Sequence, residues 1–498
     1  MRYSLFIFIF LISHTIVFSR DYNILDFGAI PDGITINTLH IQSAIDAAFK
    51  NGGGRVVIPG GHFLSGSIVL KTGVELHLLR HAVLLGSTDI KDYIKINRWK
   101  ALVMADNQNN IAITGDGEID GQGRILALQI DSLFYAGQID SVDYMFIEKR
   151  PKWYLRPQLI EFVHCRNIHV KNVKLKNAAC WVQTYDQCEN ILVESIKVNS
   201  DAYWNNDGID IQDCHNVRIT HCIINSADDG ICLKSQSPDH TCDSIYIADC
   251  SVRSSASAIK FGAVSHGGFK NVKIERIKVY DTFRSVLAME CVDGGILENV
   301  IVDNVHAFNT GNAIFIRLGH RNEKGSAGML KNVAIKNIKV EIAFGRPDDA
   351  YDIRGPELPF FHNTFPSSIT GIPGHPVENV TLENIEIKYP GRGNKGLACM
   401  PLSRLDNVPE NEASYPEFSM LGELPAWGFY VRHMDGLTMK NIKLISKAPD
   451  YRPAMIFDDV HDLDIHSLNI VGENKLNKII LHNTSHVNID KGQAVLKM

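Results

Sequence analysis

The 498-residue sequence lacks the features of several large protein classes. It has no closely spaced cysteine pair of the kind that binds zinc. Its 50 Lys and Arg against 56 Asp and Glu leave a net charge of −6, which argues against a nucleic-acid-binding surface. Beyond the N-terminus, no apolar stretch reaches the roughly 20 residues of a membrane span. With 45% hydrophobic and 21% charged residues, the chain should fold around a large core.

The first residues have the pattern of an export signal. Arg2 precedes an almost wholly apolar run from Leu5 to Phe18, and Ser19 is small enough for cleavage before Arg20. The alternative is an uncleaved N-terminal anchor, for which the run is short. The sequence therefore predicts a signal peptide over residues 1–19 and a periplasmic or secreted protein. Export permits disulfides, and we expect mostly buried thiols among the ten cysteines, with one or two bridges.

One pattern recurs from about residue 100 onward. An Asn is followed by aliphatic residues at alternate positions, as in 167–170, 190–193 and 216–219. Alternation with period two predicts strands. Strands that repeat every 20 to 30 residues or so, without long helices between them, are typical of a parallel β-helix. The recurrent Asn should form a ladder of mutually hydrogen-bonded side chains in the turns.

The ends and interruptions of this repeat define the expected organisation. A helix with Ile41, Ala44, Ile45 and Ala48 on one face, ended by Gly52–Gly54, should cap the N-terminal end of the array. We therefore predict an all-β parallel β-helix as a single domain over residues 20–498. Three stretches rich in Pro, Gly and aromatic residues should leave the solenoid as insertions, namely 122–156, 344–375 and 390–426.

Three carboxylates form the sharpest local signal. Asp207 and Asp229 begin matching copies of a second strand, 22 residues apart, and Asp228 adjoins Asp229. Stacked coils should make Asp207 and Asp229 neighbours. Three crowded carboxylates repel one another, so at least one should keep a proton near neutral pH. A protonated donor beside an ionised base suits the hydrolysis of a glycosidic bond. A calcium site or a solvated acidic ladder is the alternative.

The position after the second strand should line one edge of a groove. It is occupied in successive coils by Gln212, Lys234, Gly262, Glu290 and Arg317. Lys234 and Arg317 are candidates for binding a uronate carboxylate or sugar hydroxyls. Glu290 between them is either a further substrate contact or part of a structural ion-pair ladder.

Two residues that precede the acidic cluster complete the candidate substrate contacts. Trp204 offers an aromatic face on which a sugar ring can stack, although packing is the common role of such residues. Asn206 stands next to Asp207 in the run Asn205-Asn206-Asp207-Gly208.

Several motifs together resemble glycoside hydrolase family 28, the polygalacturonase and rhamnogalacturonan hydrolase family. These are Asp26-Phe27-Gly28-Ala29, Gly52-Gly53-Gly54, Arg156-Pro157, Trp181 and the two acidic runs, and the resemblance is good over residues 22–320. It implies a right-handed parallel β-helix and an inverting hydrolase of pectic polysaccharide. It also implies that Asp228 is the general acid, that Asp207 and Asp229 activate water, and that no metal or cofactor takes part.

The sequence departs from the family at two motifs. Where polygalacturonases have Gly-His-Gly, this chain has Ser255-Ala256-Ser257, and the nearest histidine is His266. Where they have Arg-Ile-Lys, this chain has Leu287-Ala288-Met289, followed by Glu290. We therefore expect a monomeric hydrolase of a galacturonate-containing glycan, rhamnogalacturonan-type or exo-acting rather than a plain endo-polygalacturonase. The rival functions are a Ca²⁺-dependent polysaccharide lyase and a non-catalytic glycan-binding β-helix.

Overall fold

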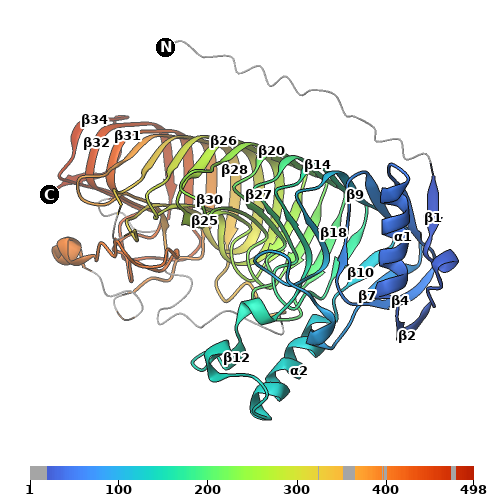
Figure 1. Cartoon of the computed structure of the whole chain (residues 1–498). Helices are drawn as coiled ribbons and strands as arrows, with labels where there is room; N and C mark the ends of the chain where they lie inside the picture. The colour runs from blue at the N-terminus through green and yellow to red at the C-terminus, as the bar shows by residue number, and fades with distance from the viewer. Residues whose placement is uncertain (1–19, 323–324, 352–364, 395, 397–400, 473–477) are drawn as a thin grey trace.

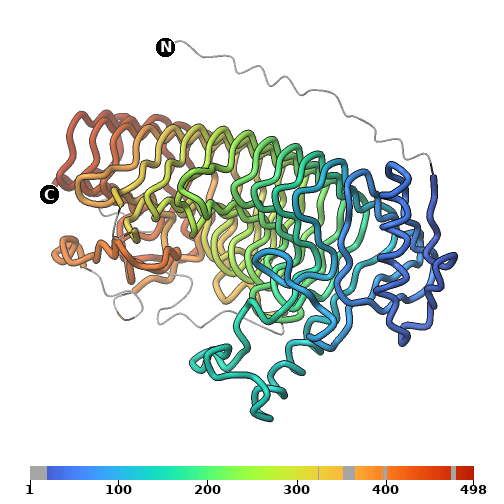
Figure 2. Tube along the Cα trace, in the orientation of Figure 1, coloured from blue at the N-terminus to red at the C-terminus, as the bar shows by residue number. Residues whose placement is uncertain are grey.

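The chain forms one long parallel β-helix in a computed structural model that describes residues 20–322, 325–351, 365–394, 396, 401–472 and 478–498 (Figure 1). A parallel 33-stranded sheet winds through these residues, and the tube view shows its coils stacked side by side from one end to the other (Figure 2). The fold class predicted from the repeat is confirmed. No helix in the described part of the chain is both long enough and apolar enough to cross a membrane.

Three columns of strands make up the N-terminal half of the β-helix, and each strand pairs in parallel with its counterpart in the next coil. The first column contains β3 (Gly54–Ile58), β6 (Val74–Leu78), β9 (Asn109–Gly115), β14 (Arg166–Lys171), β17 (Glu189–Glu194), β20 (His215–Thr220) and β23 (Cys242–Ala248). The second contains β4 (Gly61–Ser65), β7 (Ala82–Gly86), β10 (Glu118–Asp120), β15 (Lys174–Lys176), β18 (Lys197–Ser200), β21 (Ile223–Ser226) and β24 (Ser251–Ser254). The third contains β5 (Ile68–Val69), β8 (Ala101–Asp106), β13 (Gln158–Val163), β16 (Gln183–Asp186), β19 (Ile209–Gln212), β22 (Ile231–Ser235) and β25 (Ile259–Ser265).

The later coils are longer continuous strands. β26 (Gly268–Cys291), for example, pairs with β23, β24 and β25 in turn. The remaining strands are β27 (Ile296–Leu318), β28 (Met329–Ile342), β29 (Ser367–Thr370), β30 (Val377–Tyr389), β31 (Phe429–Ser446), β32 (Met455–Val471), β33 (Ile479–His482), β34 (Ser485–Ile489) and β35 (Val495–Lys497).

Aliphatic side chains from matching positions fill the interior. Ile168 pairs with Ile191 and Ile191 with Val217, and all three are at most 2% exposed. Burial of each such side chain contributes about 2 kcal/mol, and one apolar cluster runs through the coils. The period-two alternation therefore sets which face of every strand points inward.

A helix closes the N-terminal end of this core. α1 (Thr38–Lys50) buries Ile41, Ala44, Ile45 and Ala48 completely, as the sequence predicts, and it packs against β1 (Asp21–Asn23) and β3. Asn37 occupies the N-cap position, but its side chain binds the backbone of Ile30 and Thr35 rather than the helix. β2 (Asp32–Ile36) and the single-turn helices η1 (Ile24–Phe27) and η2 (Ile90–Asp92) complete this end.

The asparagine ladder of the sequence analysis is present in the turns. Asn190 Nδ2 donates to Asn167 Oδ1 at 3.0 Å, and Asn216 Nδ2 donates to Asn190 Oδ1 at 2.6 Å. Each of these residues has a positive φ, between 55° and 59°, a conformation that Asn tolerates better than most residues. The ladder thus turns the chain and joins the coils at the same positions.

The cysteines differ from expectation. The nine that the structure describes are buried free thiols, so the expected bridges do not form among them, and Cys399 lies outside the described residues. Three of them stack in successive coils, where the backbone N–H of Cys165 donates to the Sγ of Cys188 and that of Cys188 to the Sγ of Cys214, both at 3.3 Å. They fill interior space as small apolar side chains.

Besides the connection between β28 and β29, of which residues 343–351 and 365–366 are described, two long connections leave the β-helix next to the third column. The first, between β10 and β13, contains α2 (Gly123–Tyr135), η3 (Ser141–Asp143), β11 (Tyr144–Met145), β12 (Arg150–Pro151) and η4 (Trp153–Leu155), and it projects from the β-helix in Figure 1. The second, between β30 and β31, contains η6 (Leu402–Asn407). The predicted boundary at residue 19 lies outside the described residues.

Candidate active site

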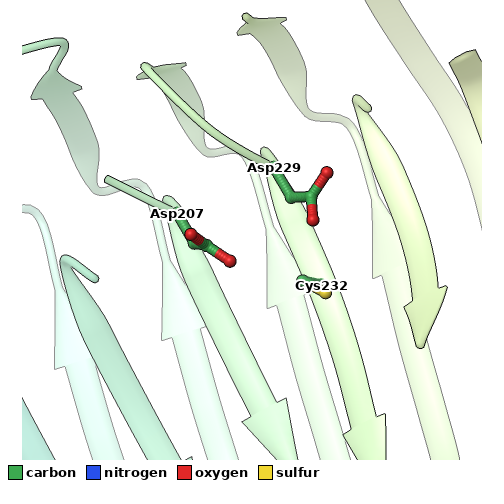
Figure 3. Close-up of side chains that lie close together, drawn as sticks. All are labelled: Asp207, Asp229 and Cys232. Atoms are coloured by element: carbon green, nitrogen blue, oxygen red, sulfur yellow. The ribbon is translucent and has the colours of Figure 1, made fainter. Parts of the chain in front are cut away.

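The acidic cluster lies at the start of two neighbouring strands of the third column. Asp207 precedes β19 and Asp229 precedes β22, and Figure 3 shows their carboxylates side by side. The glycine after each aspartate is required by close packing, because a Cβ on Gly208 would lie 2.5 Å from the carbonyl oxygen of Gly230. The backbone N–H of Gly208 also donates to the carbonyl of Asp229 at 2.9 Å. The predicted adjacency of Asp207 and Asp229 is therefore present.

Lys234 holds two of the carboxylates. Its Nζ is 3.0 Å from Asp207 Oδ2 and also contacts Asp210, which points outward from β19. Burial opposes the charge on Lys234, but Asp207 and Asp210 raise its pKa above the ordinary value. Burial raises the pKa of Asp207 well above its usual range and that of Asp210 to about 6. The single ammonium of Lys234 pairs with both carboxyls. Lys234 thus pairs with two carboxylates of the acidic cluster, and its role as a substrate contact stays a prediction.

Lys260 stands beside Asp229 in the next coil. Its Nζ is 3.2 Å from Asp229 Oδ2 and 3.8 Å from Glu290 Oε2, and the lysine is only 1% exposed. Burial opposes ionisation of Asp229, but Lys260, Lys234 and Arg284 together lower the pKa of its carboxyl below the ordinary value. Asp229 is therefore ionised at neutral pH and is suited to act as a base.

Asp228 has the opposite environment. Its side chain is half-buried, and it accepts hydrogen bonds from the backbone N–H of Asp229 at 3.0 Å and from Asn205 Nδ2 at 3.5 Å. Asn205 is itself held by the fully buried guanidinium of Arg156, at 2.8 Å. Burial raises the pKa of Asp228, and the charge of Asp229 raises it further. The adjacent residues Asp228 and Asp229 thus differ: the pKa of the first is raised, which favours the protonated form, and that of the second is lowered, which favours the ionised form.

The same cluster does not suit a metal ion. Ligand atoms of Asp207, Asp229 and Cys232 lie within 4.8 Å of one another (Figure 3). However, Lys234 Nζ lies 3.0 Å from Asp207 Oδ2 and 3.2 Å from Cys232 Sγ, and Lys260 Nζ lies 3.2 Å from Asp229 Oδ2. A thiol is also a poor ligand for Ca²⁺, which prefers six to eight oxygens. The ammonium groups of Lys234 and Lys260 therefore take the place that a cation would need.

Aromatic rings and cations gather on the N-terminal side of the carboxylates. The ring centroid of Trp99 is 4.1 Å from that of Trp153 and 4.7 Å from that of Trp181. Lys234 Nζ lies 4.3 Å from the centroid of the Trp181 ring. Arg98 lies over both Trp99 and Trp153, at 5.4 and 5.7 Å; its guanidinium donates to Gln236 Oε1 at 3.0 Å, and its charge also acts on the carboxyl of Asp186. This arrangement offers flat apolar faces and a cation beside the catalytic groups.

Two residues predicted to bind substrate are buried and make hydrogen bonds within the protein. Arg317 is 1% exposed, and its guanidinium donates to Gly371 O at 3.0 Å and to Glu410 O at 2.5 Å. Asn206 is fully buried, with its amide nitrogen bound to the carbonyls of Ala178 and Cys180. Both side chains are therefore buried and bound within the protein, and their roles as substrate contacts stay predictions.

The other candidate substrate contacts lie around the cluster. Trp204 is half-buried, and the guanidinium carbon of Arg150 lies over its ring, 5.1 Å from the ring centroid. Glu290 is 2% exposed, and its described ion pair is with Lys260, although it pairs along the strands with Arg317. His266 is half-buried in the turn after β25, where its backbone N–H donates to Ser235 O at 2.8 Å. The role of His266 stays a prediction.

Sequence reasoning missed several charged neighbours of the carboxylates. Asp210 and Lys260 were recognisable, because they occupy the same strand position as Cys232 in successive coils. Glu417, which pairs with Arg284 at 2.6 Å, was not recognisable, because it lies in a long non-repeating connection.

Comparisons with known proteins agree with this geometry. The sequence model of "Glycosyl hydrolases family 28" matches residues 51–407. A probable polygalacturonase of Vitis vinifera is 26% identical over 411 residues, which are 75% of each chain. An exo-poly-alpha-D-galacturonosidase of Dickeya chrysanthemi is 39% identical over 118 residues, 20% of this chain and 19% of that one. The family 28 exopolygalacturonase of Yersinia enterocolitica has a TM-score of 0.59 at 18% identity, covers 95% of this chain and 79% of its own, and shares the fold.

Proposed function

The chain belongs to glycosyl hydrolase family 28 and is a glycoside hydrolase of the polygalacturonase type, and from this premise we propose its substrate and mechanism. The substrate is a galacturonate-containing pectic glycan, which is cleaved with inversion of the anomeric configuration. The enzyme acts on a rhamnogalacturonan-type backbone or from a chain end, rather than as a plain endo-polygalacturonase. The protein is exported by the signal peptide over residues 1–19, which the apolar run from Leu5 to Phe18 supports.

In the proposed mechanism, Asp228 gives its proton to the oxygen of the leaving sugar as the glycosidic bond breaks. Asp229, assisted by Asp207, takes a proton from a water molecule, whose oxygen bonds to the anomeric carbon from the opposite face. The product therefore has the inverted configuration. An inverting site needs its acid and base roughly 6.5 to 9.5 Å apart to admit the water, and Asp207, which lies one coil away from Asp228, suits this requirement.

The observation that carries this proposal is the contrast between Asp228 and Asp229. The environment raises the pKa of the Asp228 carboxyl and lowers that of Asp229, although the residues are adjacent. Carboxyls with opposed pKa values are the mark of an acid and a base in one site.

The charge distribution around the carboxylates supports the substrate subtype. On the C-terminal side, Lys260 is paired with Asp229 and Glu290, and Arg284 with Glu417, so neither cation is available to a uronate. On the N-terminal side, Arg98 lies beside the tryptophan rings. We infer that a uronate binds on the N-terminal side and that the sugar on the other side is recognised through its hydroxyl groups. A backbone alternating uronate and neutral sugars has this property.

The test compares kcat/KM on polygalacturonan with that on rhamnogalacturonan oligosaccharides, for the wild type and Arg98→Gln. We expect the alternating substrate to be preferred, and Arg98→Gln to raise KM more than it lowers kcat, the result of losing uniform binding. Arg166→Gln, on an exposed strand position, is the matched control. Efficient internal cleavage of polygalacturonan that Arg98→Gln leaves unchanged would contradict the subtype.

A second experiment tests the catalytic assignment. Asp228→Asn should lower kcat by about 100-fold or more on every substrate, because an amide cannot donate the proton. Early NMR spectra of the wild-type reaction should show the inverted anomer as the first product. Retention of configuration, or activity of the variant within a few-fold of wild type, would refute the roles given to these aspartates.

A further inference from the structure

A carboxylate from outside the β-helix repeat reaches the active site. Glu417 belongs to the connection between β30 and β31, and its Oε1 lies 2.6 Å from Arg284 Nη1. The next residue, Phe418, is 4% exposed and packs edge-on to Phe365 in an apolar cluster that also contains Phe315. Glu417 is therefore held in a fixed place beside the catalytic cluster.

The same connection is tied to the β-helix at a second point. Glu410 Oε1 is 2.8 Å from Arg432 Nη2 and 3.1 Å from His433 Nε2, and the carbonyl of Glu410 accepts a hydrogen bond from Arg317 at 2.5 Å. The carbonyl of Glu412 accepts another from the backbone N–H of His320 at 2.7 Å. These contacts explain why Arg317 is buried, since it anchors the segment that carries Glu417.

Arg284 connects Glu417 with the catalytic carboxyls: its backbone N–H donates to Ala256 O at 2.9 Å, in the same turn in which the Ser257 N–H donates to Asp229 Oδ1 at 3.1 Å. Burial opposes its charge, but Glu417, Asp228 and Asp229 together raise the pKa of Arg284. Conversely, Arg284 lowers the pKa of Asp228 against the raising effects of burial and Asp229. The charged groups that act on Asp228 from the surrounding strands and connection are Asp207, Asp210, Asp229, Lys234, Lys260, Arg284 and Glu417.

We propose that Glu417 is a positioning residue for the reaction, which holds the Arg284 guanidinium and offsets its charge so that Asp228 keeps the proton that it donates. Without Glu417, Arg284 would stand as an uncompensated cation beside Asp228 and would favour the ionised carboxylate. The acid would then lose its proton at a lower pH. The proposal rests on the assignment of Asp228 as the acid.

The test measures the pH dependence of kcat/KM, whose alkaline limb reports the ionisation of the acid in the free enzyme. The substrate is whichever of an oligogalacturonate and a rhamnogalacturonan oligosaccharide the wild type cleaves faster. Glu417→Gln should move the alkaline limb to lower pH by about one pH unit. Arg284→Gln should move it to higher pH, because the cation that lowers the pKa of Asp228 is then removed. The double variant should return close to wild type.

Glu412→Gln, a substitution of an exposed residue in the same segment, is the matched control and should leave the profile unchanged. A purely structural role for Glu417 would lower activity at all pH values without moving the limb, and that result overturns the proposal. The proposal is also overturned if the alkaline limb of the double variant is shifted as far as that of Glu417→Gln. If Glu417→Gln does not fold, the direction of the Arg284→Gln shift alone decides. If Asp228→Asn is inactive but the pH profile of Glu417→Gln matches that of the wild type, this inference is rejected while the proposed function is retained.

Discussion

At the scale of single residues, the site combines groups that do not favour stability. Asp228 is half-buried next to Asp229, and its raised pKa means that its carboxylate is less stable in the folded protein than in the unfolded chain. The folded state therefore binds more protons at this group, and its contribution to stability falls as pH rises from the unfolded pKa through the raised folded pKa. A catalytic residue of this kind costs stability at neutral pH.

This linkage predicts that Asp228→Asn raises the free energy of unfolding near neutral pH while abolishing turnover. The gain should shrink as the pH is lowered toward about 4, where the unfolded carboxyl is also protonated. Thermal unfolding of both proteins across this range measures the difference. Asp239→Asn, an exposed substitution, is the control. A variant less stable than wild type at neutral pH would show that Asp228 is not held in an unfavourable environment.

At the scale of the element, the turns of the β-helix depend on the asparagine ladder. Asn190 has φ of 59°, donates to Asn167 and accepts from Asn216. Replacement by Ala loses both side-chain hydrogen bonds, and Ala tolerates the left-handed conformation less well than Asn does. We expect a destabilisation of about 2 kcal/mol, with kcat unchanged because the turn is remote from the carboxylates.

Asn190→Gly separates the two contributions, because glycine accepts the left-handed conformation without strain. It should lose about 1 kcal/mol less stability than Asn190→Ala. Chemical denaturation of the three proteins gives the comparison. Equal stability of the Ala and Gly variants would mean that the backbone conformation contributes nothing and that the hydrogen bonds alone account for the loss.

At the scale of the whole molecule, the β-helix needs no covalent bridge among its described cysteines, since the stacked coils bury one continuous apolar core. We predict that a reducing agent leaves the Tm unchanged. We also predict that the nine buried thiols react with a thiol reagent only after unfolding. A drop in Tm on reduction, or rapid labelling of several thiols in the folded protein, would contradict this description.

The structure of the repeating part of the molecule was predictable from the sequence, because in a β-helix the spacing of residues along the chain fixes their positions in successive coils. Residues one repeat apart occupy equivalent places in stacked coils, so the period-two alternation identified the interior, the recurrent Asn identified the ladder, and 22 residues of separation placed Asp207 beside Asp229. α1 was likewise predictable from its apolar face.

Only the tertiary structure determined what surrounds the carboxylates. Arg317 occupies the expected strand position, but a segment that follows no repeat covers it and turns it inward. The same segment brings Glu417 to Arg284 across a long stretch of chain. No periodicity relates such a connection to the coils, so its position depends on packing and ion pairs with residues distant in the sequence. The charge that surrounds a carboxyl, and therefore its pKa, is a property of that assembled environment and not of any motif.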